Sequence, residues 1–520
     1  MEDFPSLPNI YQQPESADAG IRRSIDHHEQ SVLDLQAEIE TLMQTVRNIR
    51  FRIFEHQETI RFYKGKITLA RRLPAELLAT IFEICTLDGW TRAPLAVSQV
   101  CTEWRIAAQA PAVWSQVYVN ADSLDPVSRT RFWLTKSQSV PIDITLDVPN
   151  NSDSLSEVIQ LLLSHQFKWR SFTLSARQLA TANFILHQCI GVYPMLQVLR
   201  LSVDEEFHTL GNGVVDESAE LRGLRNSFNH CPQLRSFIIS RNIPPTGSII
   251  PSNISSLSIN LDGFSTITLS IVTLMDLLLE VPLLEKLCIS LARAHNTTFL
   301  PNRNSERPNV TLQNLKVLTL MGQSDLFALL QSICTPTLLH LHLMSSAEPI
   351  SASQWSGLPL LQWLERGQTS LESLELRDVD VARDMFIACF IALPSLKSLK
   401  LHDSEISDAV FDSLHGAHGY CPNLATVDLR WCGQVSGQAL ARFIKGKMVT
   451  SPIESITIIN CSFVEEQHIL DLAQNTVCRL VIDLNDHCRP VGCCENERYR
   501  RRLRLRRIGT NIDEKHRLIL

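Results

Sequence analysis

Side chains of metal-binding type lie close together in a cysteine-containing segment near the C-terminus of this sequence. His487, Cys488, Cys493 and Cys494 are all of types that bind zinc, but cysteine zinc sites usually contain a C-x-x-C pair, which this segment lacks. The sequence also contains no Walker loop, H-E-x-x-H or G-x-S-x-G motif. We therefore predict no catalytic residue, no metal site and no cofactor, and a protein that is not an enzyme.

A second kind of chemistry, ion pairing with a charged protein target, is suggested by charged residues that alternate with apolar ones. They are Glu375, Arg377, Lys400, His402, Asp428 and Arg430. Alternate residues of a strand point to opposite faces of a sheet, so these six would lie in neighbouring rows on one face. Either the rows bind a charged target, or the charges pair with each other on a solvated face. In the second case each exposed pair contributes under about 1 kcal/mol.

The strands that must carry these rows are predicted by a recurring L-x-x-L-x-L pattern. It begins at Leu196, Leu234, Ile254, Leu284, Leu315, Leu338, Leu371, Leu396, Leu424 and Ile453, with weaker examples at Trp169 and Val477. Most intervals are roughly 20 to 33 residues, close to the period of leucine-rich repeats. We predict an α/β solenoid over residues 166–485, with short parallel strands on its concave side and helices outside. Residues 120–165 are interpreted as a linker and the start of the solenoid cap.

A long helix is predicted near the N-terminus by apolar residues that recur every seven positions. Positions a are Ile25, Val32, Ile39, Val46, Ile53, Ile60 and Ile67, and positions d include Leu35, Leu42, Ile49 and Tyr63. β-Branched residues at a with leucine at d favour a parallel two-stranded coiled coil, although His28 and His56 interrupt the d row. The heptad helix over residues 23–71 therefore either forms a homodimer through residues 25–70 or folds back on its own chain. Residues 1–22 lack periodicity and are predicted to be a disordered tail.

A shorter helix is predicted just after the heptads, in the segment from Leu73 to Trp114. It carries two apolar rows about 100° apart, one formed by Leu77, Ile81 and Ile84 and the other by Leu78, Phe82 and Cys85. A unit of fewer than about 50 residues has little interior, so one row can remain available to a partner. The alternative is a helical hairpin that covers both rows with its own chain.

The same segment resembles the F-box, a three-helix module. The resemblance rests on L-P-x-E-L-L-x-x-I-F at Leu73–Phe82, V-C-x-x-W-R at Val100–Arg105, and Val113-Trp114. The sequence departs from the family pattern at residues 86–94 and at Thr102. A heptad helix followed by R-R-L-P-A-E-L-L is similar to F-box proteins of mushroom-forming fungi, and Cys432 and Cys461 stand where cysteine-containing repeats behind many F-boxes have their turn residue. On this resemblance we assign residues 72–119 to an F-box.

The resemblance implies that the chain binds a Skp-type adaptor and, through it, a cullin-RING ubiquitin ligase, while its repeats bind a protein substrate. The chain would then be a substrate-recognition subunit of an SCF-type ligase. The residues expected on the adaptor side or in its immediate support are Leu73, Pro74, Leu77, Leu78, Ile81, Phe82, Val100 and Trp104. The alternative is a dimeric scaffold protein that is not associated with a ligase.

The overall composition is that of an ordinary folded protein whose net charge is too small to create a strong electrostatic field. Hydrophobic residues make up 44% of the 520 residues and charged residues 20%, with a formal net charge of -7. We therefore expect no membrane partner, no nucleic-acid partner, and a cytoplasmic or nuclear location with reduced cysteines. Residues 486–520 form a Cys/Arg-rich tail whose arginine cluster, residues 498–507, binds an anionic surface, acts as an import signal or is a solvated helix end.

Overall fold

The computed structural model describes the chain in the following segments. They are residues 15–67, 73–150, 153–204, 221–228, 230–242, 251–261, 271–291, 310–322, 324–345, 357–367, 370–379, 381–404, 406–414, 420–448, 451–461, 463–481 and 517–519. These residues form two compact units. The first contains the residues up to Ile81 together with Val97–Ala108, and the second contains Phe82–Ala96 and the residues from Gln109 onwards. No helix in the described segments is long and apolar enough to cross a membrane.

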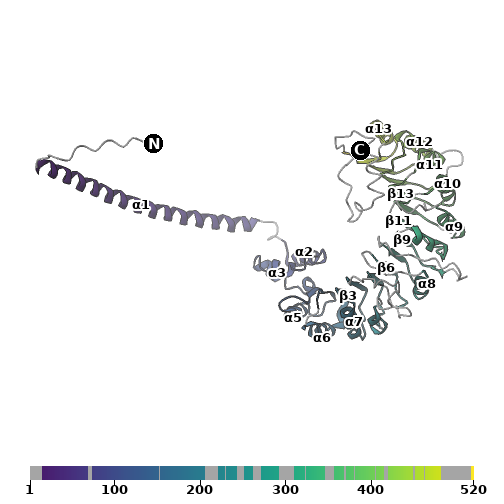
Figure 1. Ribbon diagram of the computed structural model, residues 1–520, viewed down its shortest axis with the longest axis horizontal. Coiled ribbons are helices and arrows are strands. Elements are labelled where there is room, and N and C mark those ends of the chain that lie inside the picture. Colours follow the sequence, from purple (N-terminus) through teal and green to yellow (C-terminus); the bar gives the residue numbers. More distant parts are fainter. Residues whose placement is uncertain are drawn as a thin grey trace. The chain divides into compact units, whose positions relative to one another are not determined.

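The first unit is dominated by a single helix, α1, which runs from Glu15 to Ile67 over 53 residues (Figure 1). The predicted heptad helix is therefore present, but it begins eight residues earlier than we predicted. Alanines at positions 17 and 19 have high helix propensity, a signal that the search for apolar periodicity does not detect. The predicted disordered tail is wrong for residues 15–22, and residues 1–14 lie outside the described segments.

Three short α-helices and a 3-10 turn follow α1 within the predicted F-box, residues 72–119. They are α2 (Ala75–Leu87), α3 (Ala93–Ser98), α4 (Thr102–Ala107) and η2 (Pro111–Trp114). The backbone carbonyl of Pro74 accepts the first hydrogen bond of α2, from the N–H of Leu78 at 3.1 Å. Proline has no N–H to lose, so it suits this helix start.

The second unit is built on one sheet whose strands follow the chain in order. The strands are β1 (Gln116–Asn120), β2 (Ile142–Val148), β3 (Trp169–Ala176), β4 (Val198–Val203), β5 (Ser236–Ser240), β6 (Ser256–Asn260), β7 (Lys286–Ser290), β9 (Val317–Gly322), β11 (His340–Ser345), β12 (Ser373–Arg377), β13 (Ser398–His402), β14 (Thr426–Arg430), β15 (Ser455–Ile459), β16 (Val477–Val481) and β17 (Arg517–Ile519). Neighbours from β1 to β16 are parallel, and β17 is antiparallel to β16. A separate parallel pair joins β8 (Val310–Thr311) and β10 (Ile333–Cys334).

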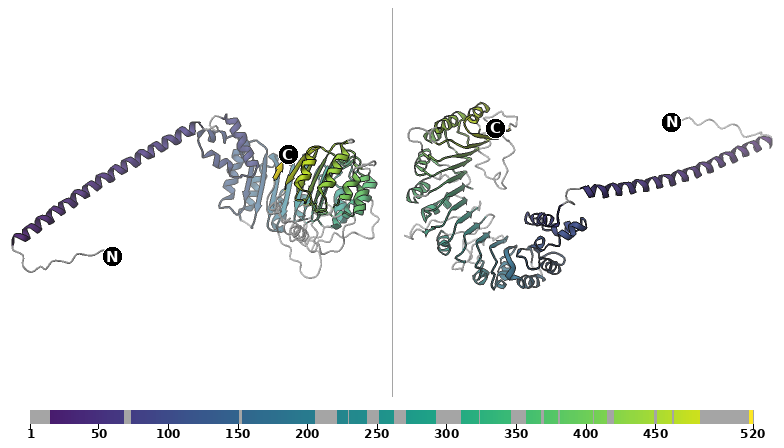
Figure 2. Two further views of the ribbon diagram at one scale, coloured as in Figure 1. Left: turned by 90° about the horizontal axis from the view of Figure 1, so that it is seen from above. Right: turned by 180° about the vertical axis from the view of Figure 1, so that it is seen from behind.

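Among the described residues, helices lie along one side of this sheet and none of them covers its other side, which we call the open side (Figure 2). The α-helices are α5 (Pro126–Ser137), α6 (Leu155–Leu163), α7 (Leu179–Gln188), α8 (Ile271–Leu279), α9 (Leu358–Gly367), α10 (Arg383–Ile391), α11 (Asp408–Leu414), α12 (Gly437–Lys447) and α13 (Glu466–Ala473). The 3-10 segments are η3 (Gln166–Lys168), η5 (Arg222–Asn226) and η6 (Ser324–Gln331). The core lies between helices and sheet, where for example Phe411 of α11 and Phe443 of α12 pack with ring centroids 5.5 Å apart.

The strand register confirms the predicted repeat pattern. Leu374 pairs with Leu399 and Leu376 with Leu401, so equivalent apolar residues of successive repeats stand side by side and are buried. Each short strand buries one edge against the next, as a solenoid requires. The weak example at Val477 was placed two positions off, because Cys478 and not Leu480 lies beside Ile456.

The parallel sheet begins about 50 residues earlier than we predicted. The structure corrects both the linker assigned to residues 120–165 and the repeat boundary at residue 166, because β1 and β2 pair in register with each other and with β3. These two repeats lack a leucine at the first position of the pattern. Trp114 and Pro141 occupy that position instead, and Trp114 is buried there.

Two recurring backbone features link one repeat to the next. Before several strands a turn closes with a hydrogen bond from the first leucine of the pattern, as from the N–H of Leu424 to the carbonyl of Cys421 at 3.1 Å. After four successive strands, one residue adopts a left-handed conformation: Asp378, Asp403, Trp431 and Asn460, at φ between 51° and 54°. The N–H of Asp403 then donates to the carbonyl of Arg430 at 2.7 Å. The chain thereby leaves the sheet while staying bonded to the next repeat.

Asn253 ties two repeats together and gives a first testable prediction. Its side-chain Nδ2 donates to the carbonyls of Cys231, Pro232 and Leu234 at 3.3, 2.9 and 2.9 Å. Asn253→Ala leaves these acceptors without that donor, so we expect the free energy of unfolding in urea to fall by about 1 to 2 kcal/mol. Ser252→Ala, a change at the exposed neighbouring residue, should stay within about 0.5 kcal/mol of the unchanged protein. Equal losses in the two variants would contradict this role.

Candidate functional site

The first candidate surface is one face of α2, and the structure separates its two apolar rows. Leu77, Ile81 and Ile84 are 52%, 43% and 51% exposed, whereas Leu78 and Phe82 are each 2% exposed. Cys85, the third member of the second row, is half-buried. One apolar row of α2 is therefore in the core, and the other faces solvent in the single chain.

The eight residues predicted for the adaptor side also divide into exposed and buried ones. Pro74, Leu77, Ile81 and Val100 are exposed, and Leu73 and Trp104 are half-buried. Leu78 and Phe82 are buried, so in this fold they cannot be contact residues and remain only as support for the exposed row. Ile84 and Leu87 belong to the exposed part of α2 and were not among the predicted contacts. The spacing of Ile84 from Ile81 already indicated its place.

The second candidate surface is the open side of the sheet at β11 to β14, where the predicted charged rows are in register. Glu375 stands beside Lys400, and Lys400 stands beside Asp428. Arg377 stands beside His402, and His402 beside Arg430. The structure adds His342 of β11, which stands beside Glu375 and was missed. The rule that alternate strand residues share a face, applied to the repeat at Leu338, would have found it.

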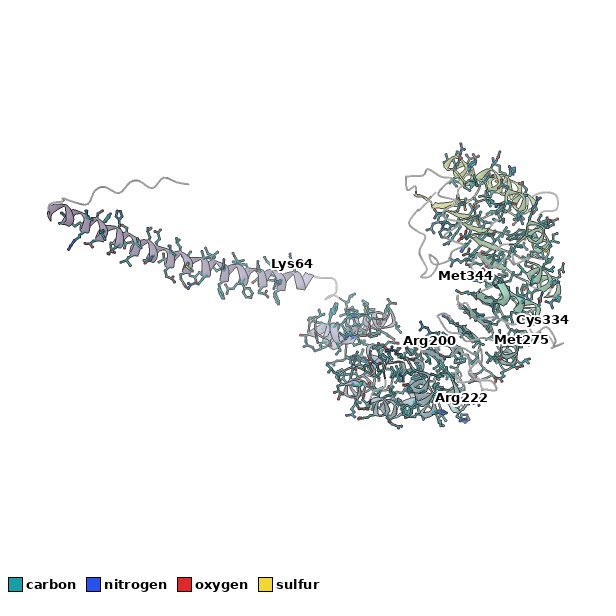
Figure 3. The ribbon with its side chains drawn as sticks, viewed as in Figure 1. Lys64, Arg200, Arg222, Met275, Cys334 and Met344 are labelled. Atoms are coloured by element: carbon teal, nitrogen blue, oxygen red, sulfur yellow. The ribbon has the colours of Figure 1, made fainter. Side chains whose placement is uncertain are left out.

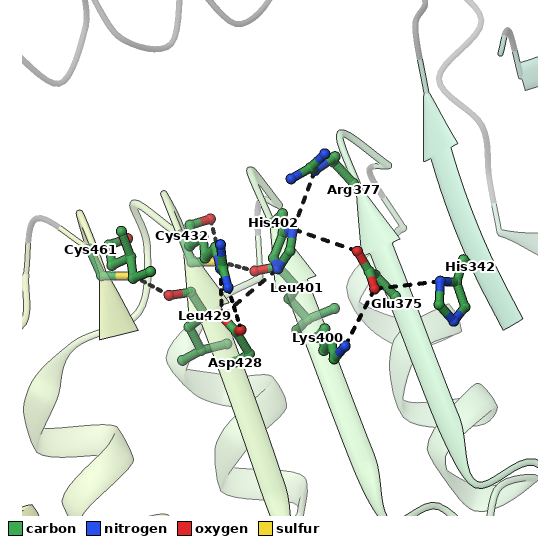
Figure 4. A network of polar contacts seen from close by, with 12 residues as sticks. His342, Glu375, Arg377, Lys400, Leu401, His402, Asp428, Leu429, Cys432 and Cys461 are labelled. Atoms are coloured by element: carbon green, nitrogen blue, oxygen red, sulfur yellow. Dashed lines mark hydrogen bonds and ion pairs between the residues drawn. The ribbon is translucent and has the colours of Figure 1, made fainter. Parts of the chain in front are cut away.

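Glu375 is the centre of this charged surface (Figure 4). Its carboxylate lies 3.6 Å from Nδ1 of His342, 3.7 Å from Nζ of Lys400 and 3.8 Å from Nδ1 of His402. Asp428 is held by a two-pronged contact, because Nε and Nη2 of Arg430 each donate to it at 2.9 Å. The charges thus pair largely with one another, and the Glu375 side chain is only 18% exposed.

His402 joins the two halves of the charged surface. Nε of Arg377 donates to Nδ1 of His402 at 3.3 Å, which fixes the neutral ring with its proton on Nε2. That Nε2 lies 3.8 Å from Oδ1 of Asp428 and makes no hydrogen bond within the described residues. Burial, assisted by the charge of Arg377, lowers the pKa of His402 to about 4, against the opposing attraction of Asp428. Burial also lowers the pKa of His342, which Glu375 opposes.

The buried His402 predicts a dependence of stability on pH. Its pKa is lower in the folded chain than in the unfolded chain, so between about pH 6.5 and pH 4 the unfolded state binds the extra proton. The neutral His402 ring therefore makes its full contribution to the free energy of unfolding above pH 6.5. This contribution is lost as the pH falls toward 4, by up to about 3 kcal/mol. We expect His402→Asn to reduce the slope of the free energy of unfolding against pH, measured by urea unfolding across that range. His187→Asn, at an exposed histidine, should leave the slope unchanged, and an equal slope in all three proteins would contradict the assignment.

The described residues contain no cluster of three or more His, Cys, Asp and Glu side chains able to hold a metal ion. His487, Cys488, Cys493, Cys494 and the arginine cluster lie outside the described segments. Several buried cysteines inside them are free thiols, among them Cys189, Cys231, Cys389 and Cys421. Burial raises the pKa of Cys189, Cys231, Cys389 and Cys421 to about 12, which makes these thiols poor nucleophiles at neutral pH.

Comparison with known proteins finds similarity among solved structures. No family model matches the sequence, and no curated protein matches it. Among solved structures, the crystal structure of the Rad7 and Elc1 complex in yeast is similar, with a TM-score of 0.38 and 14% sequence identity. The likeness covers 80% of this chain and 94% of that chain. At this level it supports no conclusion about the fold or partners of this protein.

Proposed function

We propose that this chain is the substrate-recognition subunit of a cullin-RING ubiquitin ligase of the SCF type. The observation that carries the proposal is the division of α2 into a buried row and an exposed row. Exposed apolar side chains that follow one helix face are typical of a surface that a partner helix or groove covers. The F-box resemblance of the surrounding sequence supports a Skp-type adaptor as that partner.

The open side of the sheet is proposed to hold the target. In the C-terminal repeats, cationic Lys400 stands between anionic Glu375 and Asp428 on neighbouring strands, and Arg430 pairs with Asp428 on the same strand. Such a mixed surface favours a partner that carries both charge signs, since each internal ion pair can be exchanged for one with the partner. We place target binding at Glu375, Arg377, Lys400, Asp428 and Arg430, with His342 added. His402, which was predicted as a contact residue, is buried and can only support this surface.

The proposed activity needs no catalytic residue, metal or cofactor in this chain. A chain that binds the adaptor at one surface and the target at another holds the target near the ubiquitin carrier of the ligase. The transfer then becomes effectively unimolecular, which accounts for the rate gain by proximity alone. The proposal places the protein in the cytoplasm or the nucleus.

A dimeric scaffold without a ligase is the second candidate, because the apolar side chains at heptad positions a and d of α1 are exposed. We call this row of side chains the seam of α1. Co-purification separates the two functions. If the chain is a ligase subunit, a Skp-type adaptor is recovered with it, and captured targets accumulate when the proteasome is inhibited. Recovery of no adaptor under conditions in which the chain is folded would favour the scaffold and overturn the proposal.

A further inference from the structure

The seam of α1 remains in contact with solvent along its whole described length. Side chains project from all around α1 as far as Lys64 (Figure 3). The apolar side chains at positions a and d are between 48% and 60% exposed: Ile25, Val32, Leu35, Ile39, Leu42, Val46, Ile49, Ile53, Ile60 and Tyr63. A contiguous apolar stripe of this length on a soluble protein marks an interface.

The occupant of this seam must present an equally long stripe with the same seven-residue period. A second copy of α1 meets both conditions. If the exposed halves of these ten side chains are covered on each of two helices, the buried surface is on the order of 1,500 Å², which is the size of a standard stable interface. A helix of 53 residues is about 80 Å long, so few other partners would match its length.

We propose that α1 of two copies forms a parallel, in-register coiled coil and that the protein is a homodimer. β-Branched residues at a with leucine at d favour two parallel strands. In that arrangement the residue just before each position a, called g, lies beside the residue just after the next position d, called e, of the other copy. Examples are Glu38 with Met43 and Arg52 with Gln57. Each of the flanking pairs formed by residues 24–64 contains at most one charged residue, so like charges do not face each other.

The two histidines at d positions fix the register of the dimer. In register, His28 lies opposite His28 of the partner copy, and His56 lies opposite its own counterpart. A shift by one heptad would place His28 against Leu35. Two polar residues that face each other at one heptad position of an apolar seam favour a single register of the two helices, and they also weaken the dimer. His28→Leu with His56→Leu should therefore lower the Kd of the dimer by about tenfold or more.

Sedimentation of the full chain over a range of concentrations tests the dimer. We expect twice 58.7 kDa, about 117 kDa. Ile39→Asp with Leu42→Asp puts two carboxylates into the seam and should return the mass to 58.7 kDa. The matched control, Ala37→Asp with Gln44→Asp, puts two carboxylates on the opposite helix face and should leave the dimer intact. A monomer at every concentration, or a dimer that survives the seam substitutions, would overturn the proposal.

The parallel orientation has a separate test. A single His28→Cys substitution should form a disulfide between the two copies under mild oxidation, with the unchanged chain as the baseline. An antiparallel pair holds the two copies of residue 28 far apart, so a dimer without this cross-link overturns the parallel arrangement. These measurements use the chain alone, without adaptor. Their failure is therefore distinct from a failure of the proposed ligase function.

Discussion

Leu77→Ala combined with Ile81→Ala is expected to weaken binding of the Skp-type adaptor by about one to two powers of ten in Kd. A whole side chain of this size contributes about 1.5 to 3 kcal/mol when it is removed from water, and about half of each remains to be buried on association. Both are about half exposed in the single chain, so their truncation should leave the free energy of unfolding nearly unchanged. Calorimetric titration of adaptor into the purified variant measures the first effect, and urea unfolding measures the second.

The matched control for this variant removes two equally exposed apolar side chains from repeat helices. Phe184 of α7 and Ile391 of α10 are 47% and 56% exposed. Phe184→Ala with Ile391→Ala should keep adaptor affinity within about threefold of the unchanged chain. Phe82→Ala, by contrast, should cost about 3 to 5 kcal/mol of stability because it opens a cavity in the core. Full adaptor affinity of the Leu77/Ile81 variant would contradict the docking surface.

Glu375→Lys is expected to destabilise the repeats by about 3 kcal/mol. Glu375 contacts the ammonium of Lys400 and the rings of His342 and His402. Asp428 also lies near His402. Reversing its charge places a new ammonium among these groups in a surface that is largely shielded from water, and breaking such a pair is costly. Urea unfolding followed by circular dichroism measures the loss.

Glu372 of the same repeat provides the control for this charge reversal. It pairs with Lys397 at 2.6 Å, but both side chains are more exposed, at 37% and 58%. An exposed pair contributes under about 1 kcal/mol, so Glu372→Lys should have a small effect. If both reversals cost the same, the charges around Glu375 do not act as a connected group.

Much of the sheet could be predicted from the sequence because its apolar residues are placed by one rule. Leu399 and Leu401 are fixed by the period of the strand, and their neighbours in adjacent repeats obey the same rule. The rule failed where a residue other than leucine fills a buried position of the pattern. Trp114 fills the first position of the pattern before β1, so a search for leucine placed the start of the sheet too late.

The candidate site could be predicted only in part. The helical period located the two rows of α2, but period alone cannot say which row faces the core, since that depends on how the neighbouring segments pack. Leu78 and Phe82 were therefore grouped with Leu77 and Ile81. The strand rule placed the charged rows correctly, but it could not give the low pKa of His402, which depends on the burial of its ring and on the charges of Arg377 and Asp428.

The strictly sequential order of the strands has a consequence for how the repeats unfold. Each strand from β2 to β15 bonds to the strands just before and just after it along the sheet, so the stability of the array is close to a sum of local terms between neighbours. Damage at β12 should melt the nearby repeats first and leave distant ones folded. Hydrogen exchange in Glu375→Lys should then rise near that strand and fade with each repeat toward β1.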